Sequence, residues 1–129
     1  MTDTLLLAVI DDDSSVRTAL SGLLRSHDFR VETFATAEAF LASAARQSAR
    51  CVVCDIQLPG GMSGIELKQA ISTPVILMTA FASDAVLART SQLGAVCLLR
   101  KPFGNDELMA CLARAGLSSG RTPSRIHVI

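Results

Sequence analysis

The sequence predicts one α/β domain, a three-layer α/β/α sandwich in which five helices cover both faces of a five-stranded parallel sheet. Short apolar runs of strand length alternate five times with segments whose apolar residues recur at helical spacing. Hydrophobic residues make up 50% of the chain and aromatic residues only 4%, a composition that suits an α/β core of aliphatic side chains. The 129 residues fit a single domain. A sheet of this kind binds ligands at the carboxyl ends of its strands.

The first two strands are predicted at residues 5–10 and 30–34. The first is a continuous apolar run that stops abruptly at Asp11, as a strand buried on both faces does when it reaches the surface. Ser14 or Ser15 is expected to cap the helix that follows, which ends at His27 and Asp28. Residues 30–34 alternate between apolar and polar side chains, and Thr36 can cap a short helix over residues 37–42.

The third strand, residues 51–55, is apolar and ends on Asp55. After a loop that contains Pro59 and two glycines, residues 64–71 form a short helix of about two turns. The fourth strand, residues 74–78, is followed directly by Thr79.

The last units begin with a helix that Ser83 or Asp84 caps and that Gly94 ends. Residues 95–99 are the fifth strand, and residues 105–115 form the fifth helix, which stops at Gly116. We therefore place the domain at residues 1–116. Residues 117–129 are rich in Ser, Gly and Arg at their start and are expected to be a tail or linker.

Charge and hydropathy exclude two classes of partner. Lys plus Arg and Asp plus Glu both number 12, and the pI is near 6.7, so the segment lacks the broad positive field that direct nucleic-acid binding needs. No apolar run approaches the roughly 20 residues that cross a bilayer, and the start lacks a basic secretory leader. We expect a cytoplasmic protein that does not bind a membrane.

The cysteines and histidines offer no second site. Cys51 and Cys54 have the spacing of a zinc or redox pair, but they lie in a predicted strand, where side chains three apart point to opposite faces. Buried, reduced thiols are the favoured interpretation, and no disulfide is expected in the cytosol. His27 and His127 are expected to be solvent-exposed bystanders.

Polar residues follow four of the predicted strands: Asp11, Asp12, Asp55, Thr79 and Lys101. Any one of them alone is better explained as an ordinary turn or cap residue. Together, three carboxylates at neighbouring strand ends would repel one another unless a cation or a basic group compensated their charge. Mg²⁺ is the natural ion, because it prefers oxygen ligands from one or two carboxylates with water and phosphate, and Lys101 adds a fixed positive charge.

This set can transfer a phosphoryl group. An Asp carboxylate can attack phosphorus and form an aspartyl phosphate while a metal ion and a lysine neutralise the oxygens of the transferred group. Thr79 can hydrogen-bond one of those oxygens. Asp13 is expected to be a loop or cap residue and not a ligand.

The chain resembles the response-regulator receiver domain of two-component signalling from about residue 5 to residue 115. The resemblance rests on residues 9–13 (Val-Ile-Asp-Asp-Asp), residues 55–59 (Asp-Ile-Gln-Leu-Pro) with 62–64 (Met-Ser-Gly), residues 78–80 (Met-Thr-Ala) and residues 101–103 (Lys-Pro-Phe). It implies a flavodoxin-like fold with strand order 2-1-3-4-5.

The resemblance also implies roles for individual residues. Asp55 is the phosphoacceptor, and Mg²⁺, with Mn²⁺ as an alternative, is bound by Asp12, Asp55 and the backbone carbonyl of Gln57, while Asp11 acts through water. Thr79 and Lys101 bind the phosphoryl group. The small Ala80 leaves access to it, and the peptide bond before Pro102 is expected to be cis.

Three departures from the family pattern bear on function. Thr79 follows Asp55 by 24 positions, fewer than usual, which shortens the third helix. Leu98 stands where the family usually has Tyr or Phe, so the coupling between Thr79 and the output surface could be weaker or differently arranged. Gln57 and the bulky Phe81 occupy positions that control water access, and we expect slow self-dephosphorylation.

The resemblance implies a signalling module and not an enzyme in the usual sense, although it could catalyse its own phosphorylation and dephosphorylation. A sensor histidine kinase or phosphotransfer protein would phosphorylate Asp55, and the face of the fourth helix, fifth strand and fifth helix would signal, for example through a phosphorylation-dependent dimer. The alternative is a receiver-like interaction module that works without phosphorylation. A hydrolase or phosphotransferase with an aspartyl-phosphate intermediate is disfavoured, because Gln57 stands where such enzymes need a second Asp.

Overall fold

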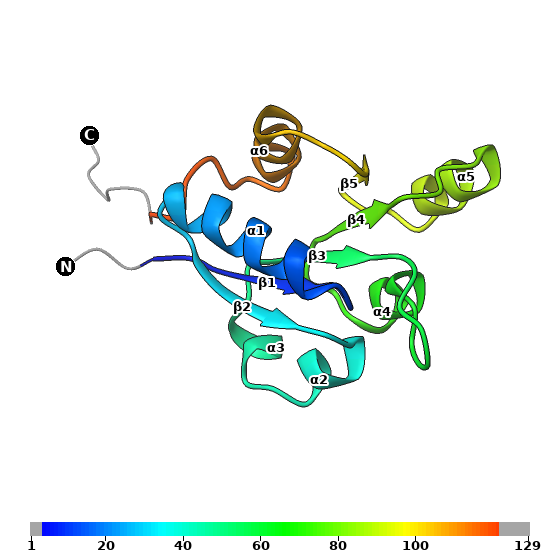
Figure 1. The fold of residues 1–129 in the computed structure, drawn as a ribbon, viewed down its shortest axis with the longest axis horizontal. Helices are drawn as coiled ribbons and strands as arrows, with labels where there is room; N and C mark the ends of the chain where they lie inside the picture. Colours follow the sequence, from blue (N-terminus) through cyan, green and yellow to red (C-terminus); the bar gives the residue numbers. More distant parts are fainter. Residues whose placement is uncertain (1–3, 122–129) are drawn as a thin grey trace.

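A computed structural model describes residues 4–121 of the chain. These residues form five strands and six helices in the order β1 (Leu6–Ile10), α1 (Ser14–Ser26), β2 (Arg30–Phe34), α2 (Ala37–Leu41), α3 (Ala45–Ser48), β3 (Cys51–Asp55), α4 (Gly64–Ala70), β4 (Val75–Thr79), α5 (Asp84–Gln92), β5 (Cys97–Arg100) and α6 (Asn105–Arg114). The strands make one parallel sheet in the order β2-β1-β3-β4-β5, which confirms the predicted fold class and strand order. Figure 1 shows all their carboxyl ends pointing the same way.

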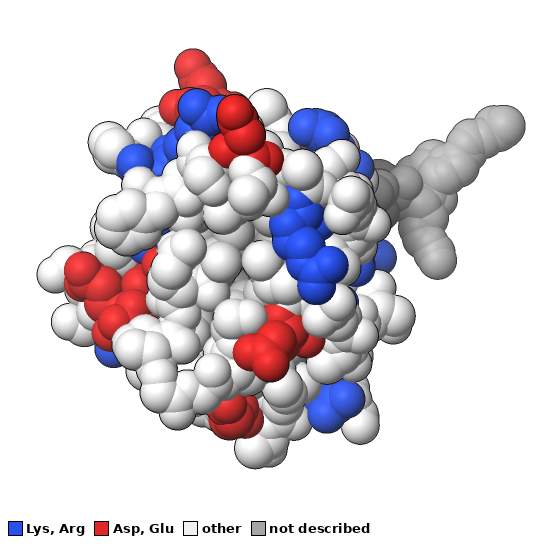
Figure 2. All heavy atoms as spheres, turned by 90° about the vertical axis from the view of Figure 1, so that its right-hand side faces the viewer, with Lys and Arg blue, Asp and Glu red and all other residues white. Residues whose placement is uncertain are grey.

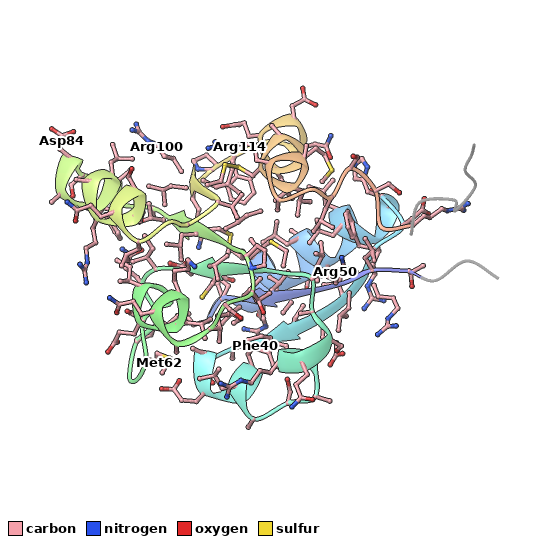
Figure 3. The ribbon with its side chains drawn as sticks, turned by 180° about the vertical axis from the view of Figure 1, so that it is seen from behind. Phe40, Arg50, Met62, Asp84, Arg100 and Arg114 are labelled. Carbon is pink, nitrogen blue, oxygen red and sulfur yellow. A yellow bond between two sulfur atoms is a disulfide. The ribbon has the colours of Figure 1, made fainter. Side chains whose placement is uncertain are left out.

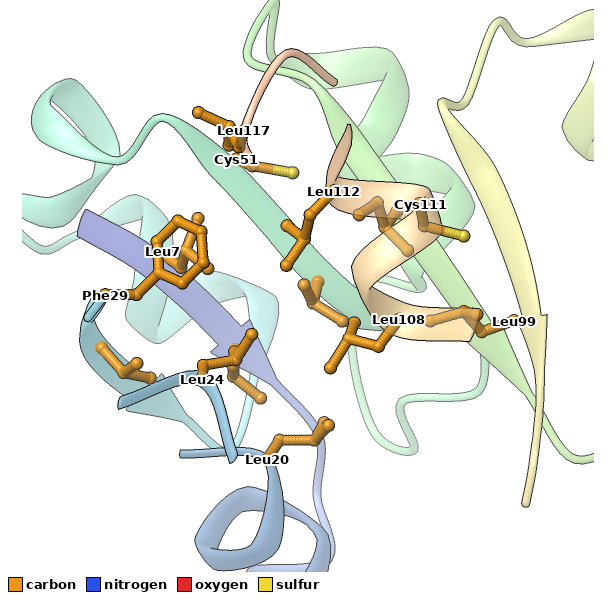
Figure 4. Packing of buried hydrophobic residues seen from close by; sticks show 14 of the residues in the cluster. Leu7, Leu20, Leu24, Phe29, Cys51, Leu99, Leu108, Cys111, Leu112 and Leu117 are labelled. Carbon is orange, nitrogen blue, oxygen red and sulfur yellow. The ribbon is translucent and has the colours of Figure 1, made fainter. Parts of the chain in front are cut away.

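Two hydrophobic clusters lie on opposite faces of the sheet, because successive side chains of a strand alternate. Leu7 and Val9 pack with the buried residues of α1 and α6, and part of this cluster is drawn in Figure 4. Leu6, Ala8 and Ile10 pack with residues of α2, α3 and α4 on the other face. Every residue of β1, β3 and β4 is buried. This continuous burial explains why these strands are uninterrupted apolar runs.

The helices differ from the prediction in two details. The segment after β2 forms two short helices, α2 and α3, where one was expected. The hydroxyl and the backbone N–H of Ser43 both donate to the carbonyl of Phe40, at 2.7 Å and 3.0 Å, which closes α2 early. Helix α1 is capped by Asp13, whose Oδ1 accepts hydrogen bonds from the backbone N–H groups of Ser15 and Val16. Ser14 and Ser15 were therefore the wrong choice, whereas the cap role given to Asp13 is confirmed.

The other helix signals hold. Thr36 and Ser83 cap α2 and α5 through their side chains as predicted, and Ser63, for which no cap was predicted, caps α4 in the same way. Helix α4 has seven residues and is the short third helix that the sequence predicted. Its capping box pairs Ser63 with Glu66. Gly94 and Gly116 follow α5 and α6 with φ of 74° and 85°, a backbone conformation that favours glycine.

Residues 117–121 pack against the domain. Leu117 is buried in the cluster with α1 and α6. The backbone N–H of Leu5 donates to the Gly120 carbonyl at 2.6 Å, and the Gly120 N–H donates to the His27 carbonyl at 2.9 Å. A β-carbon on Gly120 would collide with the backbone of Asp28. The domain boundary after residue 116 stays a prediction, and the rest of the predicted tail, with His127, lies outside the described residues.

The cysteines divide into two pairs. Cys51 and Cys54 are free, buried and in opposite clusters, as the strand prediction required. Cys97 of β5 and Cys111 of α6 form a disulfide with a Cα–Cα distance of 5.7 Å, so the expectation of no disulfide was wrong. Residues 14 apart in sequence become neighbours because α6 packs across β5, and no local pattern indicates this contact. Within residues 4–121 no helix is long and apolar enough to span a membrane.

Candidate functional site at the carboxyl edge of the sheet

The predicted polar residues converge because the parallel register aligns the ends of their strands. Ile10 pairs with Cys54, Asp55 with Met78, and Thr79 with Arg100. Asp11 and Asp12 follow β1, and Lys101 follows β5. Figure 2 looks onto the side of the molecule where the strands end, and its acidic atoms form separate groups and not one continuous field.

Three carboxylates lie close enough to share one ion. One oxygen from each of Asp11, Asp12 and Asp55 lies within 4.8 Å of the others. Asp11 is fully buried and Asp55 is 6% exposed, whereas Asp12 faces solvent. Carboxylate oxygens at this spacing, with an open side toward water, are the donor set that Mg²⁺ or Mn²⁺ prefers. The residues present therefore fit a hard divalent cation.

Lys101 supplies the compensating positive charge. Its Nζ donates to Asp11 Oδ2 at 2.7 Å and to Asp55 Oδ2 at 2.5 Å. Burial lowers the pKa of Lys101, but the hydrogen bonds and charges of the two carboxylates outweigh it and leave that pKa above its ordinary value. The backbone N–H of Lys101 donates to the Thr79 carbonyl at 2.8 Å, and the peptide bond to Pro102 is cis. Backbone and side chain together fix the ammonium group at the site.

Both oxygens of Asp55 have partners. Oδ2 accepts from Lys101, and Oδ1 accepts from the backbone N–H of Gln57 at 2.8 Å. Burial raises the pKa of Asp55, Lys101 and the Gln57 N–H lower it, and the charge of Asp11 raises it; the net shift is upward. This balance holds the carboxylate in one orientation while leaving it in a poorly hydrated place, where a reacting oxygen is more nucleophilic than in bulk water.

Asp11 is held in a similar way by contacts that the sequence did not predict. Its Oδ1 accepts from the backbone N–H of Asp13 at 2.9 Å, and its carbonyl accepts from Arg17 Nη1 at 2.8 Å. Arg17 lies one turn inside α1, so this helix helps to fix the loop that carries both acidic residues. In the sequence, the signal for this contact was a basic residue one turn into the helix that follows the acidic residues.

Thr79 is fully buried, and its hydroxyl does not bond to Asp55. It donates to the side-chain oxygen Oε1 of Gln57 at 3.0 Å and accepts from the backbone N–H of Phe81 at 3.0 Å. The structure thus brings Thr79 to the site but pairs it with Gln57. The sequence predicted both residues near Asp55 without indicating that they bond to each other.

The loop between β3 and α4 is fixed by two contacts that the sequence did not predict. A β-carbon on Gly64 would overlap the Asp55 carbonyl, so only glycine lets the start of α4 lie against the end of β3. The backbone N–H of Met62 donates to Glu38 Oε2 at 2.7 Å. That hydrogen bond is the main reason why the pKa of Glu38 lies below its ordinary value. Gly64 belongs to a motif already noted, but nothing local links Glu38 to Met62.

An open depression beside the carboxylates would admit a substrate. It is lined by Asp12, Asp55, Gln57, Leu58, Pro59, Ala80 and Phe81. Phe81 is 72% exposed, a rare position for a large apolar side chain, and it follows the small, exposed Ala80. Ala80 and Phe81 therefore line the open approach to Asp55.

Leu98 and His27 lie outside this constellation. Leu98 is half-buried in β5 and packs against the cluster that contains Phe40 and Leu67. His27 Nε2 lies 2.9 Å from Asn105 Oδ1, so His27 is partly buried at the end of α1 and is not a free surface residue. The carboxylates, Thr79 and Lys101 thus lie together at the strand ends.

Comparison with known proteins gives a consistent family. The family model for the response regulator receiver domain matches residues 7–113 of the chain. The chain is 38% identical over 112 residues to the transcriptional regulatory protein FixJ of Bradyrhizobium diazoefficiens, a match that covers 83% of this chain and 54% of that protein. It is 30% identical to the response regulator protein TodT of Pseudomonas putida, over 83% of this chain and 49% of that protein. The chain therefore spans about half the length of these curated relatives.

Solved structures agree. The response regulator StyR superposes with a TM-score of 0.77 at 36% identity, over 87% of this chain and 59% of that chain. The chemotaxis protein CheY4 of Vibrio cholerae superposes with a TM-score of 0.78 at 27% identity, over 87% of this chain and 98% of that chain. The match thus spans almost all of the CheY4 chain and little more than half of the StyR chain.

Proposed function

The chain belongs to the response regulator receiver domain family, and we propose that within it Asp55 accepts a phosphoryl group from a sensor histidine kinase or a phosphotransfer protein. The observation that carries this proposal is the ammonium group of Lys101 between two buried carboxylates, 2.7 Å from Asp11 and 2.5 Å from Asp55. A buried pair of acids held by one lysine is costly as a purely structural feature, because burying charge requires compensation. The arrangement is well suited to charge that arrives with a phosphoryl group.

In the proposed reaction, a carboxylate oxygen of Asp55 forms a bond to phosphorus while the bond from phosphorus to the donor histidine nitrogen breaks. Asp11, Asp12, Asp55 and the Gln57 carbonyl would hold Mg²⁺ or Mn²⁺, and a bound ion would neutralise oxygens of the transferred group. Lys101 can exchange its hydrogen bond with Asp55 Oδ2 for one with a phosphoryl oxygen. The ammonium group thus stays paired throughout the transfer.

Thr79 is the proposed link between the new charge and the rest of the domain. Its hydroxyl is paired with Gln57 before phosphorylation, and a phosphoryl oxygen would compete for the same proton. A charge-assisted hydrogen bond to phosphate is stronger than a neutral one to an amide, so Thr79 is expected to leave Gln57. Thr79 ends β4, directly before the loop to α5.

The proposed output surface is the face of α5, β5 and α6, which corresponds to helix 4, strand 5 and helix 5 of the family. The sparse packing of α5 and β5 supports this, since α5 buries only Thr90 and β5 buries only Leu99. Leu98 contacts the cluster that also receives Val86 of α5, so it can transmit a shift of α5 to β5 by repacking. Partner binding or a phosphorylation-dependent dimer in the cytoplasm would then change.

Phe81 and Gln57 are the proposed control of phosphoryl lifetime. Phe81 is an apolar side chain beside the depression that water must enter to reach Asp55. We expect slow self-dephosphorylation. Phe81→Ala should shorten the lifetime of the aspartyl phosphate about tenfold, which corresponds to a hydrolysis barrier lower by about 1.4 kcal/mol. A lifetime of only seconds that Phe81→Ala leaves unchanged would contradict this role.

The test of the phosphoacceptor is incubation with acetyl phosphate and Mg²⁺, followed by intact-mass measurement. The chain should gain the mass of one phosphoryl group, Asp55→Asn should gain none, and removal of Mg²⁺ by chelation should suppress the gain. Asp13→Asn is the matched control, because Asp13 is a neighbouring acid whose carboxylate caps α1 and is not part of the carboxylate set. Failure to gain mass, together with failure to bind Mg²⁺, would favour the interaction module that works without phosphorylation.

A further inference from the structure

Two cysteines far from the carboxylates lie across the interface between β5 and α6. Cys97 is the first residue of β5 and Cys111 lies in the second half of α6, and their Cα atoms are 5.7 Å apart. This separation is within the range in which two cysteines bond without backbone movement. The receiver chemistry proposed above uses neither residue.

The other two cysteines provide an internal contrast. Cys51 is fully buried in β3, and burial raises its pKa to about 12. Cys54 is also fully buried, and burial, followed by the charges of Asp55 and Asp11, raises its pKa further. Thiols of this kind remain protonated and have no oxidising partner within reach, because they lie on opposite faces of the sheet.

Cys97, in contrast, can be reached from solvent. It is half-buried and lines a groove with Leu87 and Thr90 of α5, Leu98 of β5 and Arg114 of α6. The guanidinium nitrogen Nη1 of Arg114 lies 3.5 Å from Cys97 Sγ. Positive charge beside a sulfur favours the thiolate, which is the reactive form. Figure 3 labels Arg114 near β5, and Figure 4 shows Cys111 on the helix that covers the sheet.

We propose that Cys97 and Cys111 are a reversible redox modification site, oxidised by a low-molecular-weight disulfide such as glutathione disulfide. The Cys97 thiolate attacks one sulfur of that disulfide, the disulfide bond breaks, and one glutathione leaves as a thiolate. The Cys111 sulfur, after losing its proton, attacks Cys97 in the resulting mixed disulfide, and the second glutathione leaves. Two protein thiols thus lose two electrons and two protons, and one glutathione disulfide becomes two glutathione molecules.

The order of these two steps follows from exposure. Cys111 is 4% exposed, whereas Cys97 lines the groove. Cys97 therefore reacts first with the glutathione disulfide, and Cys111 then attacks the mixed disulfide. The closed bond joins α6 to β5, which restricts two of the three elements of the output face. This consequence, unlike the chemistry, rests on the proposed function.

The chemistry is tested by equilibrating the whole chain in glutathione buffers, from fully reduced to fully oxidised, and then alkylating under denaturing conditions. Peptide mass mapping should give four alkylated cysteines at the reducing end and two, Cys51 and Cys54, at the oxidising end. Four alkylated cysteines in every buffer, or a bond that involves Cys51 or Cys54, would overturn the proposal.

Single variants test the order of attack. Cys111→Ser should accumulate a stable glutathione adduct on Cys97, whereas Cys97→Ser should form an adduct on Cys111 much more slowly. Arg114→Gln should slow the reaction of Cys97 by about two- to fivefold near neutral pH and by less at high pH, where the thiolate forms without help. Arg100→Gln is the matched control, since Arg100 lies at the other end of β5. Equal adduct formation in both cysteine variants would overturn the assigned order.

The consequence is tested by comparing oxidised and reduced chains with acetyl phosphate and Mg²⁺. Both should gain a phosphoryl group at rates within about twofold, because the bond lies away from the carboxylates, but phosphorylation should change hydrogen exchange in α6 less in the oxidised chain. Equal changes in α6 would overturn the restriction. A failure of the proposed function would look different, since neither redox form would gain mass while the alkylation pattern would still change.

Discussion

The interior strands of the sheet and its β5 edge differ in how closely they are packed. Every residue of β1 and β3 is buried, whereas in β5 only Leu99 is. Helix α1 buries Leu20 and Leu24, and α5 buries only Thr90. The buried strands β1 and β3 lead into the carboxylates, and the β5 edge carries the groove and the disulfide. Regions with few buried contacts open at lower free energy, so chemistry and conformational response occupy different parts of one domain.

The largest contrast should appear when the same substitution is made at a buried and at an exposed phenylalanine. Phe40 is fully buried and packs edge-on against Phe34 with ring centroids 5.6 Å apart, while Phe81 is 72% exposed. Phe40→Ala should lower the free energy of unfolding by about 3–5 kcal/mol, because it leaves a cavity. Phe81→Ala should change it by less than about 0.5 kcal/mol. Urea unfolding followed by circular dichroism measures both, and similar losses would refute the contrast.

The next largest effect on stability is expected from alanine substitutions at two glycines. Gly64→Ala should cost about 1–3 kcal/mol, because the added methyl group meets the backbone of Asp55, which cannot move without displacing the carboxylate. Its phosphorylation by acetyl phosphate should also slow. Gly22→Ala is the control, since a β-carbon there meets nothing and alanine favours the interior of α1, so about 0.5–1 kcal/mol of added stability is expected. Denaturant unfolding of the two variants should therefore shift in opposite directions.

Gln57 tests whether its hydrogen bond with Thr79 opposes phosphorylation. Gln57→Leu removes the acceptor for the Thr79 hydroxyl, and leaving that hydroxyl unpaired costs the unphosphorylated form about 1 kcal/mol. The variant should therefore favour the phosphorylated form by about fivefold. Titration with acetyl phosphate, read as the fraction phosphorylated at steady state, measures this shift. Gln92→Leu makes the same change at an exposed position in α5 and should have no effect. An unchanged titration in Gln57→Leu would mean that this hydrogen bond does not oppose phosphorylation.

Glu38 should give the smallest effect. Its pKa is lowered in the folded chain by the Met62 N–H, so its stabilising contribution is present above its unfolded pKa and is lost as pH falls through the lower, folded value. Glu38→Gln should therefore be less stable than the parent chain near neutral pH. This difference in stability should become smaller as the pH falls. Glu32→Gln, an exposed acid in β2, is the control. Thermal unfolding from about pH 3 to about pH 7, the range in which carboxyl groups titrate, measures this difference. A difference that does not change with pH would mean that the hydrogen bond contributes nothing.

The carboxylate site was predictable because its signals are local. Asp11, Asp55 and Thr79 each follow an apolar run, and parallel strands must bring such ends to one edge. The caps Thr36 and Ser83 were equally local, since each satisfies an N–H of the helix it begins. The pairing of Thr79 with Gln57, and of Glu38 with Met62, joins residues 22 and 24 positions apart and had no such signal.

The sequence by itself determined the alternation of elements, the strand order that the family resemblance implies and the residues that meet at the carboxyl edge. Hydrophobic period and strand-end chemistry are properties of consecutive residues, so they survive without the fold. The tertiary structure alone decided that Lys101 bridges Asp11 and Asp55, that Gly64 closes on Asp55, and that Cys97 meets Cys111. These contacts depend on how α4, α6 and the loop after β5 pack against the sheet, and distance along the chain does not encode that packing.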